Sequence, residues 1–173
     1  KKVLEIGCGS GLILMPIAAQ CTEYVATDFS GETIDHLREK IVAQGLTNVR
    51  LLNRIADDFS DIKLAKFDTI IINSVAQYFP HADYLLNVVG GAIKVLAPGG
   101  NIFVGDVRNL QLLEAFHASV RLANADDRER TTALKEKVLQ SITHEKELVL
   151  APAFFLALKL HFPEIHYVQI LPK

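Results

Sequence analysis

The chain has 173 residues, which suits one domain, and half of them are apolar, enough for a sizeable core. Its 18 basic and 20 acidic residues nearly balance, so the sequence lacks the signature of a strongly basic nucleic-acid binder. Pro16, Pro98 and Pro152, with scattered charges, interrupt every apolar run before it could span a bilayer. We therefore expect neither a nucleic-acid nor a membrane partner. Cys8 and Cys21 form no disulfide framework, which favours a reducing cytoplasmic setting.

The chain begins with a strand, a glycine-rich turn and a helix. Residues 3–6 are apolar and end at glycines, as a strand does, and residues 24–28 form a second strand. Residues 12–19 read as a buried helix that Pro16 should strain or kink. Because the chain has no initiator Met, shows no signal peptide and opens on a core strand, we interpret it as a trimmed domain.

Strands and helices continue to alternate up to residue 106. Ser30 can cap the next helix, and Gly45 ends it. Residues 49–52, 67–73 and 102–106 read as three further strands. The helix before the last of these has apolar residues at helical spacing: Leu85, Val88, Val89, Ala92 and Leu96. The alternation predicts an α/β fold with a doubly wound, mostly parallel, Rossmann-like sheet and helices on both faces.

From Leu110 onward the pattern becomes mainly helical. Helices are predicted around residues 110–120, 134–140 and 152–162, the last opened by a proline in its first turn. The charged stretch 126–130 reads as a solvated face or loop. A last strand is predicted over residues 165–171. We therefore expect one domain, 1–173, with a cofactor-binding core at 1–106 and a helical, substrate-side region at 107–164.

The strongest local feature is the loop Gly7-Cys8-Gly9-Ser10-Gly11. It follows a strand and precedes a helix, where an open α/β sheet binds ligands and the helix start offers free N–H groups. Leu12 stands where a dinucleotide fingerprint has its third glycine. Glu5 would repel a pyrophosphate but suits a cofactor with an ammonium and a sulfonium group. Asp28 can accept hydrogen bonds from ribose hydroxyls, as in either cofactor class.

Each of these residues also has a plainer interpretation. Glu5 could be an exposed strand residue, and Asp28 could be a helix cap. Cys8 is a conceivable nucleophile, but a small filler residue is the simpler interpretation, because no activating histidine lies nearby in the sequence.

Residues 3–11 resemble the first motif of class I S-adenosylmethionine (SAM)-dependent methyltransferases. Asp28 matches the ribose-binding acid of that family. Residues 67–71 resemble its fourth-strand motif, and residues 96–100 resemble the turn before its fifth strand. The matches occur in the family's order between residues 2 and 106.

This resemblance implies a site for SAM, with S-adenosylhomocysteine as product and no metal. The glycine loop would line the methionine part, with Glu5 supporting the loop or the amino group. The ends of the second and third strands would hold ribose and adenine, with Asp57 or Asp58 at the adenine edge, and the end of the fourth strand would meet the methyl group. The implied cofactor-binding residues are Glu5, Gly7, Cys8, Gly9, Gly11, Asp28, Phe29, Ser30, Ala56, Asp57, Asn73, Ser74 and Val75.

A narrower resemblance is to the methyltransferase domains embedded in nonribosomal peptide synthetases. The matching stretches are 73–80, 83–86, 103–108, 112–117 and 152–155. Many of those domains methylate the α-amino group of an aminoacyl thioester on a carrier domain. The resemblance implies a carrier-bound aminoacyl or peptidyl substrate, or a small molecule, with neighbouring synthetase domains as partners. Methyltransferases of this fold usually end in an antiparallel hairpin, so residues 165–173 would be its first strand. The resemblance thus implies a domain truncated at both ends.

An amine must lose its proton before it attacks the methyl group, so a nearby base or acceptor would help. Tyr78 could orient the amine through its hydroxyl, Asp106 ends a sheet strand, and His81 titrates near neutrality. These three are our catalytic candidates. Equally, Tyr78 could be core packing, His81 a neighbour of a helix cap and Asp106 an acceptor for Arg108.

Other functions of this fold would require sequence features that differ from those of this chain. Amino-methyltransferases of DNA and RNA carry Asn-Pro-Pro-Tyr after strand four, whereas this chain has Asn-Ser-Val-Ala at residues 73–76. No cluster of acids suggests a metal-dependent O-methyltransferase. A NAD(P)-dependent reductase usually has a Tyr-x-x-x-Lys pair, which the sequence lacks. A free-standing small-molecule O- or C-methyltransferase is the second interpretation, and an inactive SAM-binding domain is the last.

Overall fold

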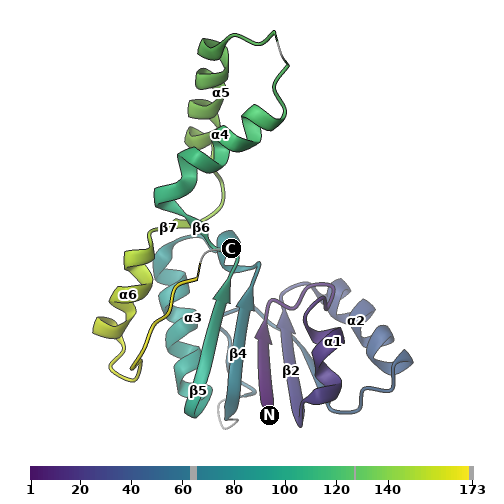
Figure 1. Ribbon diagram of the computed structural model, residues 1–173. Coiled ribbons are helices and arrows are strands. Elements are labelled where there is room, and N and C mark those ends of the chain that lie inside the picture. Colours follow the sequence, from purple (N-terminus) through teal and green to yellow (C-terminus); the bar gives the residue numbers. More distant parts are fainter. Residues whose placement is uncertain (63–65, 127, 172–173) are drawn as a thin grey trace. The chain divides into compact units, whose positions relative to one another are not determined.

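The computed structural model describes residues 1–62, 66–126 and 128–171 (Figure 1). The chain divides into two compact units, Lys1–Asp106 and Val107–Lys173. The boundary falls at the residue where we expected the cofactor-binding core to end, while a single domain over 1–173 stays a prediction. Within the described ranges, every helix is too short or too polar to cross a membrane.

The first unit is built on a five-stranded parallel sheet with the strand order β3-β2-β1-β4-β5 (Figure 1). Its strands are β1 (Lys2–Ile6), β2 (Glu23–Asp28), β3 (Val49–Asn53), β4 (Phe67–Asn73) and β5 (Leu96–Gly105). The chain adds strands in one direction from β1 to β3 and in the other from β4 to β5. The strand order therefore reverses between β1 and β4, where open α/β sheets bind ligands.

Helices cover both faces of this sheet because right-handed crossovers run in opposite directions on its two sides. The crossovers place α1 (Leu14–Ile17) and α2 (Gly31–Ala43) on one face and α3 (Ala82–Val95) on the other. The predicted doubly wound fold is confirmed. The helix predicted over 12–19 is shorter than expected and continues as a 3₁₀ helix, Ala18–Gln20. Pro16 lies in the first helical turn, where its missing N–H has no intrahelical partner to lose.

Strand β5 begins six residues earlier than predicted, directly after α3. The turn-like residues 98–100 lie inside it, where the pairing with β4 shifts register between Phe67 and Thr69. Gly99 lies in this irregular segment with φ +74°, a backbone conformation that glycine adopts without strain because it has no Cβ. Asp106 lies just beyond the strand rather than within it.

The described part of the second unit contains three α-helices, a 3₁₀ helix (Leu110–Leu112) and a two-stranded parallel sheet. Its elements are β6 (Arg108–Asn109), α4 (Leu113–Ala123), α5 (Thr131–Thr143), β7 (Val149–Leu150) and α6 (Pro152–His161). The three predicted helices are confirmed, with shifted ends. The strand predicted over 165–171 is wrong, because these residues form no strand in the structure. A strand needs a hydrogen-bonded neighbour as well as a suitable local sequence. Residues 127, 172 and 173 of our expected elements lie outside the described residues.

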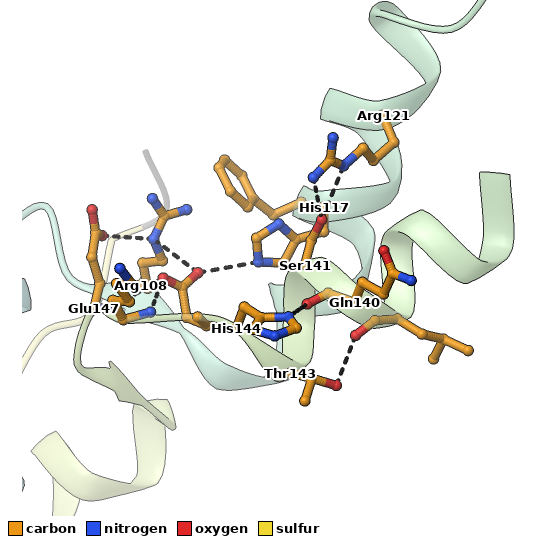
Figure 2. A network of polar contacts seen from close by, with 12 residues as sticks. Arg108, His117, Arg121, Gln140, Ser141, Thr143, His144 and Glu147 are labelled. Atoms are coloured by element: carbon orange, nitrogen blue, oxygen red, sulfur yellow. Dashed lines mark hydrogen bonds and ion pairs between the residues drawn. The ribbon is translucent and has the colours of Figure 1, made fainter. Parts of the chain in front are cut away.

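A polar network joins α4 to the segment that leads into β7 (Figure 2). Arg108 Nε donates to Glu147 at 2.6 Å and lies 3.5 Å from Glu145, which lies 3.1 Å from His117 Nε2. The Arg108 guanidinium also lies 4.3 Å from the centre of the Phe116 ring. Burial alone would raise the pKa of Glu145, but the Glu147 backbone amide and the Arg108 charge outweigh it and lower that pKa. These contacts connect segments of the second unit that are distant in sequence.

One buried polar pair links β1 to β2 inside the first unit. Tyr24 is 0% exposed and Glu5 3%, and the Tyr24 hydroxyl donates to Glu5 Oε2 at 2.8 Å. Val3, Glu5 and Tyr24 share one sheet face because alternate strand residues point the same way. Burial raises the pKa of Glu5 to about 7, although the Tyr24 hydrogen bond lowers it. The interpretation of Glu5 as an exposed strand residue is therefore wrong.

We predict that this buried carboxyl makes stability depend on pH. Its folded pKa lies above the ordinary value of 4.5, so the folded state binds the extra proton between about pH 4.5 and 7. The free energy of unfolding of the wild type should therefore fall, relative to Glu5→Gln, as pH rises through that window, by on the order of 3 kcal/mol. Urea unfolding at several pH values measures it, with Glu23→Gln as control, because Glu23 is the partly exposed first residue of β2. Parallel curves for wild type and Glu5→Gln would contradict the prediction.

Candidate functional site

The loop between β1 and α1 lies at the reversal of strand order and is shaped by three glycines. Gly7, Gly9 and Gly11 all have positive φ, at 74°, 49° and 83°. A Cβ at Gly7 would lie 2.6 Å from Val75 Cγ2, and one at Gly11 would lie 2.5 Å from Leu37 Cδ1. Nothing lies within 4 Å of a Cβ at Gly9. Close packing therefore requires two of these glycines, while the middle one faces open space where a ligand can approach the backbone.

Asp28 organises this loop from the end of β2. Its carboxylate is 7% exposed and accepts hydrogen bonds from Gly9 N and Ser30 N, each at 2.9 Å. A carboxylate has about four acceptor positions, so both oxygens can accept further bonds. The cap of α2 is Ser30, whose Oγ accepts from Thr33 N at 3.2 Å. Asp28 is therefore a link between the loop and the helix start rather than the cap itself.

Cys8, within the loop, and Glu5, in β1, are both buried. Cys8 is buried, and its backbone amide donates to Thr27 O at 2.9 Å. Burial, with the nearby Glu5 and Asp28 carboxylates, raises the pKa of Cys8 to about 12. Its thiol therefore stays protonated at neutral pH, which suits a packing residue and not a nucleophile.

The loops after β2 and β3 hold the residues expected at the adenosine. Phe29 is 75% exposed, and Asp57 is exposed and accepts from the Tyr84 hydroxyl at 2.8 Å.

The neighbouring Asp58 has both oxygens engaged, by Ser60 N at 3.0 Å and by Arg54 Nη1 at 2.5 Å. Hydrogen bonds from the Ser60 amide and hydroxyl, then from Arg54, lower the pKa of Asp58 to about 2. Of the two acids, Asp57 is the better candidate for a ligand, with Ala56 half-buried beside it.

The carboxyl ends of β4 and β5 are joined by a short hydrogen bond between strained residues. Ser74 and Asp106 have φ 57° and 59°, and Ser74 Oγ donates to Asp106 Oδ2 at 2.5 Å. Asn73 Nδ2 donates to the same Ser74 oxygen at 2.9 Å. Non-glycine residues in this backbone region are strained and cluster at functional sites. The structure thus brings together Asn73, Ser74 and Asp106, three of the predicted site residues.

The other two catalytic candidates lie between β4 and α3. Tyr78 is 70% exposed, so its interpretation as core packing is wrong. His81 is the N-cap of α3, and its Nδ1 accepts from Tyr84 N at 3.2 Å. This geometry gives the imidazole a structural role, because the cap uses one ring nitrogen as acceptor.

Gln77 lies in the 3₁₀ helix Ala76–Tyr78 and is not among the predicted site residues. Gln77 is 8% exposed, and its Oε1 is buried without a hydrogen-bond partner in the part of the chain that the structure describes. A polar residue in a short turn is usually exposed, so the sequence carried no signal for this burial. Over the described ranges, no group of three or more His, Cys, Asp or Glu side chains could hold a metal ion.

Comparison with known proteins agrees with this geometry. A family model described as "Methyltransferase domain" matches residues 4–102. Chondramide synthase cmdD of Chondromyces crocatus is 51% identical over 174 residues, covering 100% of this chain and 4% of that protein. The probable non-canonical nonribosomal peptide synthetase CymA of Salinispora arenicola is 45% identical over 172 residues, covering 99% of this chain and 2% of that protein. The chain thus spans only a few per cent of these relatives.

Solved structures show the same fold at lower identity. A SAM-dependent methyltransferase from Clostridium acetobutylicum has a TM-score of 0.60 at 22% identity, covering 66% of this chain and 46% of that one. PKMT2 from Rickettsia typhi in complex with AdoHcy has a TM-score of 0.59 at 21% identity, covering 82% of this chain and 28% of that one. The chain therefore belongs to the methyltransferase domain family, and it has the same fold as these solved methyltransferases.

Proposed function

We propose that this domain transfers the methyl group of SAM to the α-amino nitrogen of an aminoacyl or peptidyl thioester on the carrier domain of a nonribosomal peptide synthetase. The observation that supports it most is the open backbone at Gly9 beside the Asp28 carboxylate, at the reversal of strand order. The similarity to synthetase segments over the whole chain supports the carrier-bound substrate and neighbouring synthetase domains as partners. Cys8 and Cys21 are both free, which is compatible with the reducing cytoplasm.

The residues at the loop fit SAM, which would supply an activated methyl group on a sulfonium. Gly7, Gly9 and Gly11 would let the backbone approach its methionine part. The spare acceptor positions of Asp28 would take the ribose hydroxyls. The exposed ring of Phe29 would lie beside the adenine, with Asp57 at its edge.

Glu5, Cys8 and Ser30 would support this site without donating to the cofactor. Glu5 and Cys8 are buried, and Ser30 holds the start of α2. Beyond the loop, Val75 packs on Gly7 and would set the position of the methyl group.

On the side of the methyl acceptor, Asp106, Tyr78 and His81 would each have one role. The Asp106 carboxylate, held by Ser74, would accept the proton that the amine loses. The exposed hydroxyl of Tyr78 would orient the amine. His81 Nδ1 accepts a hydrogen bond in the α3 cap, so the other ring nitrogen, Nε2, would act as the donor towards the substrate.

We predict that Gly9→Ala lowers SAM affinity at least tenfold, because the added methyl group fills the open space beside the backbone. Gly45→Ala is a matched control, since Gly45 also has positive φ, at 66°, and nothing within 4 Å of its Cβ. Both variants should lose roughly 1–2 kcal/mol of stability from backbone strain. Calorimetric SAM titration and urea unfolding separate the two effects. Equal SAM affinity in the two variants would refute the role of Gly9.

We predict that Asp28→Ala weakens SAM binding by about 10- to 100-fold, the loss expected for hydrogen bonds to a charged group. Asp35→Ala is the control, because Asp35 is exposed on α2 and its ion pair with Arg38 is solvated. Calorimetry with SAM gives the dissociation constants. Unchanged affinity in Asp28→Ala would rule out the ribose contact.

The acceptor is tested with the full-length protein, labelled SAM and an aminoacyl-loaded carrier protein. Mass spectrometry of the thioester should show a gain of one methyl group, located on nitrogen. Transfer to a free phenol or carboxylic acid, with none to the thioester, would instead favour a small-molecule O-methyltransferase.

A further inference from the structure

We propose that Gln77 binds the acceptor amine: its buried side-chain oxygen accepts a hydrogen bond from an N–H of the nucleophile and so selects nitrogen over oxygen. The inference rests on the proposed function, since it assigns a residue to the recognition of that substrate.

The first support is the unmet hydrogen bond of Gln77. Its side chain is more than nine-tenths buried, yet Oε1 has no partner among the residues described. Buried acceptors are nearly always paired in folded proteins, because an unpaired one has lost its water without compensation. A bound molecule that carries a donor removes this penalty, so the oxygen favours ligands with an N–H or O–H.

The second support is the position of Gln77 in the chain. It lies two residues after Val75, whose side chain touches the glycine loop at Gly7. It lies three residues after Ser74, whose hydroxyl is bonded to Asp106. Gln77 therefore belongs to the segment that borders both the proposed donor site and the proposed proton acceptor, at the reversal of strand order.

The third support is chemical. A neutral primary amine has a lone pair for attack and still carries two hydrogens, one of which can bond to Gln77. As its nitrogen forms the new bond to the methyl carbon, the carbon–sulfur bond breaks and its electron pair stays on sulfur. The nitrogen becomes positive and then releases one proton to a base. A hydroxyl that has lost its proton has no hydrogen left to donate, so the Gln77 oxygen would repel that anion.

The hydrogen bond to Gln77 also strengthens as the reaction proceeds. The N–H becomes a better donor as positive charge develops on nitrogen, so the neutral acceptor stabilises the transition state more than the ground state. Loss of the acceptor should therefore lower kcat more than it raises KM.

The test compares Gln77→Met, which keeps an unbranched side chain without the amide oxygen, with Gln77→Glu, which keeps an acceptor oxygen. Gln44→Met is the matched control, since Gln44 is exposed at the end of α2. In the full-length protein with carrier-bound aminoacyl substrate, Gln77→Met should lower kcat about tenfold or more. Gln77→Glu should keep more activity. Calorimetric SAM affinity should change less than about twofold, and thermal unfolding should show no loss of stability, because the change removes an unpaired acceptor.

Each contrary result has a distinct meaning. Wild-type kcat on the thioester amine in Gln77→Met would overturn the inference and leave the proposed function standing. A tenfold loss of SAM affinity with unchanged kcat would also overturn it, because Gln77 would then serve the methyl donor. If the wild type methylates only oxygen acceptors, the proposed function fails and the inference fails with it.

Discussion

The site depends on the hydrogen bonds that the Asp28 carboxylate accepts from the backbone amides of Gly9 and Ser30. One side chain at the end of β2 thereby sets both the glycine loop after β1 and the first turn of α2. Two amide donors compensate a largely buried carboxylate for the water that it loses on folding. The group proposed to hold the ribose is thus fixed in place by the protein itself.

Besides this link, the sheet buries one polar pair in an otherwise apolar core. The Tyr24–Glu5 pair lies among the apolar residues under α1 and α2, and burial keeps the Glu5 pKa near neutrality. A partly protonated Glu5 carries less negative charge than an exposed glutamate would. In the proposed site, the attraction for a positively charged cofactor would therefore rest more on Asp28 than we expected.

Local patterns in the sequence determined the fold class and the position of the glycine loop. Apolar runs bounded by glycines and prolines marked the five strands, and the spacing of residues 7–11 marked the loop. These features depend only on residues close together in the sequence, so they can be recognised without knowledge of the rest of the fold. The prediction for residues 165–171 was wrong: their apolar pattern is typical of a strand, but a strand exists only with a hydrogen-bonded partner.

The tertiary structure alone decided which polar groups meet and which are left without a partner. Ser74 and Asp106 are 32 positions apart, and only the pairing of β4 with β5 brings their side chains within hydrogen-bonding distance. The burial of Gln77 and the use of His81 as a helix cap depend likewise on contacts that no local pattern encodes. The sequence thus determined the scaffold and its glycine loop, because backbone conformation follows from neighbouring residues. Long-range packing decided the protonation and pairing of the polar side chains, because burial is a property of the whole fold.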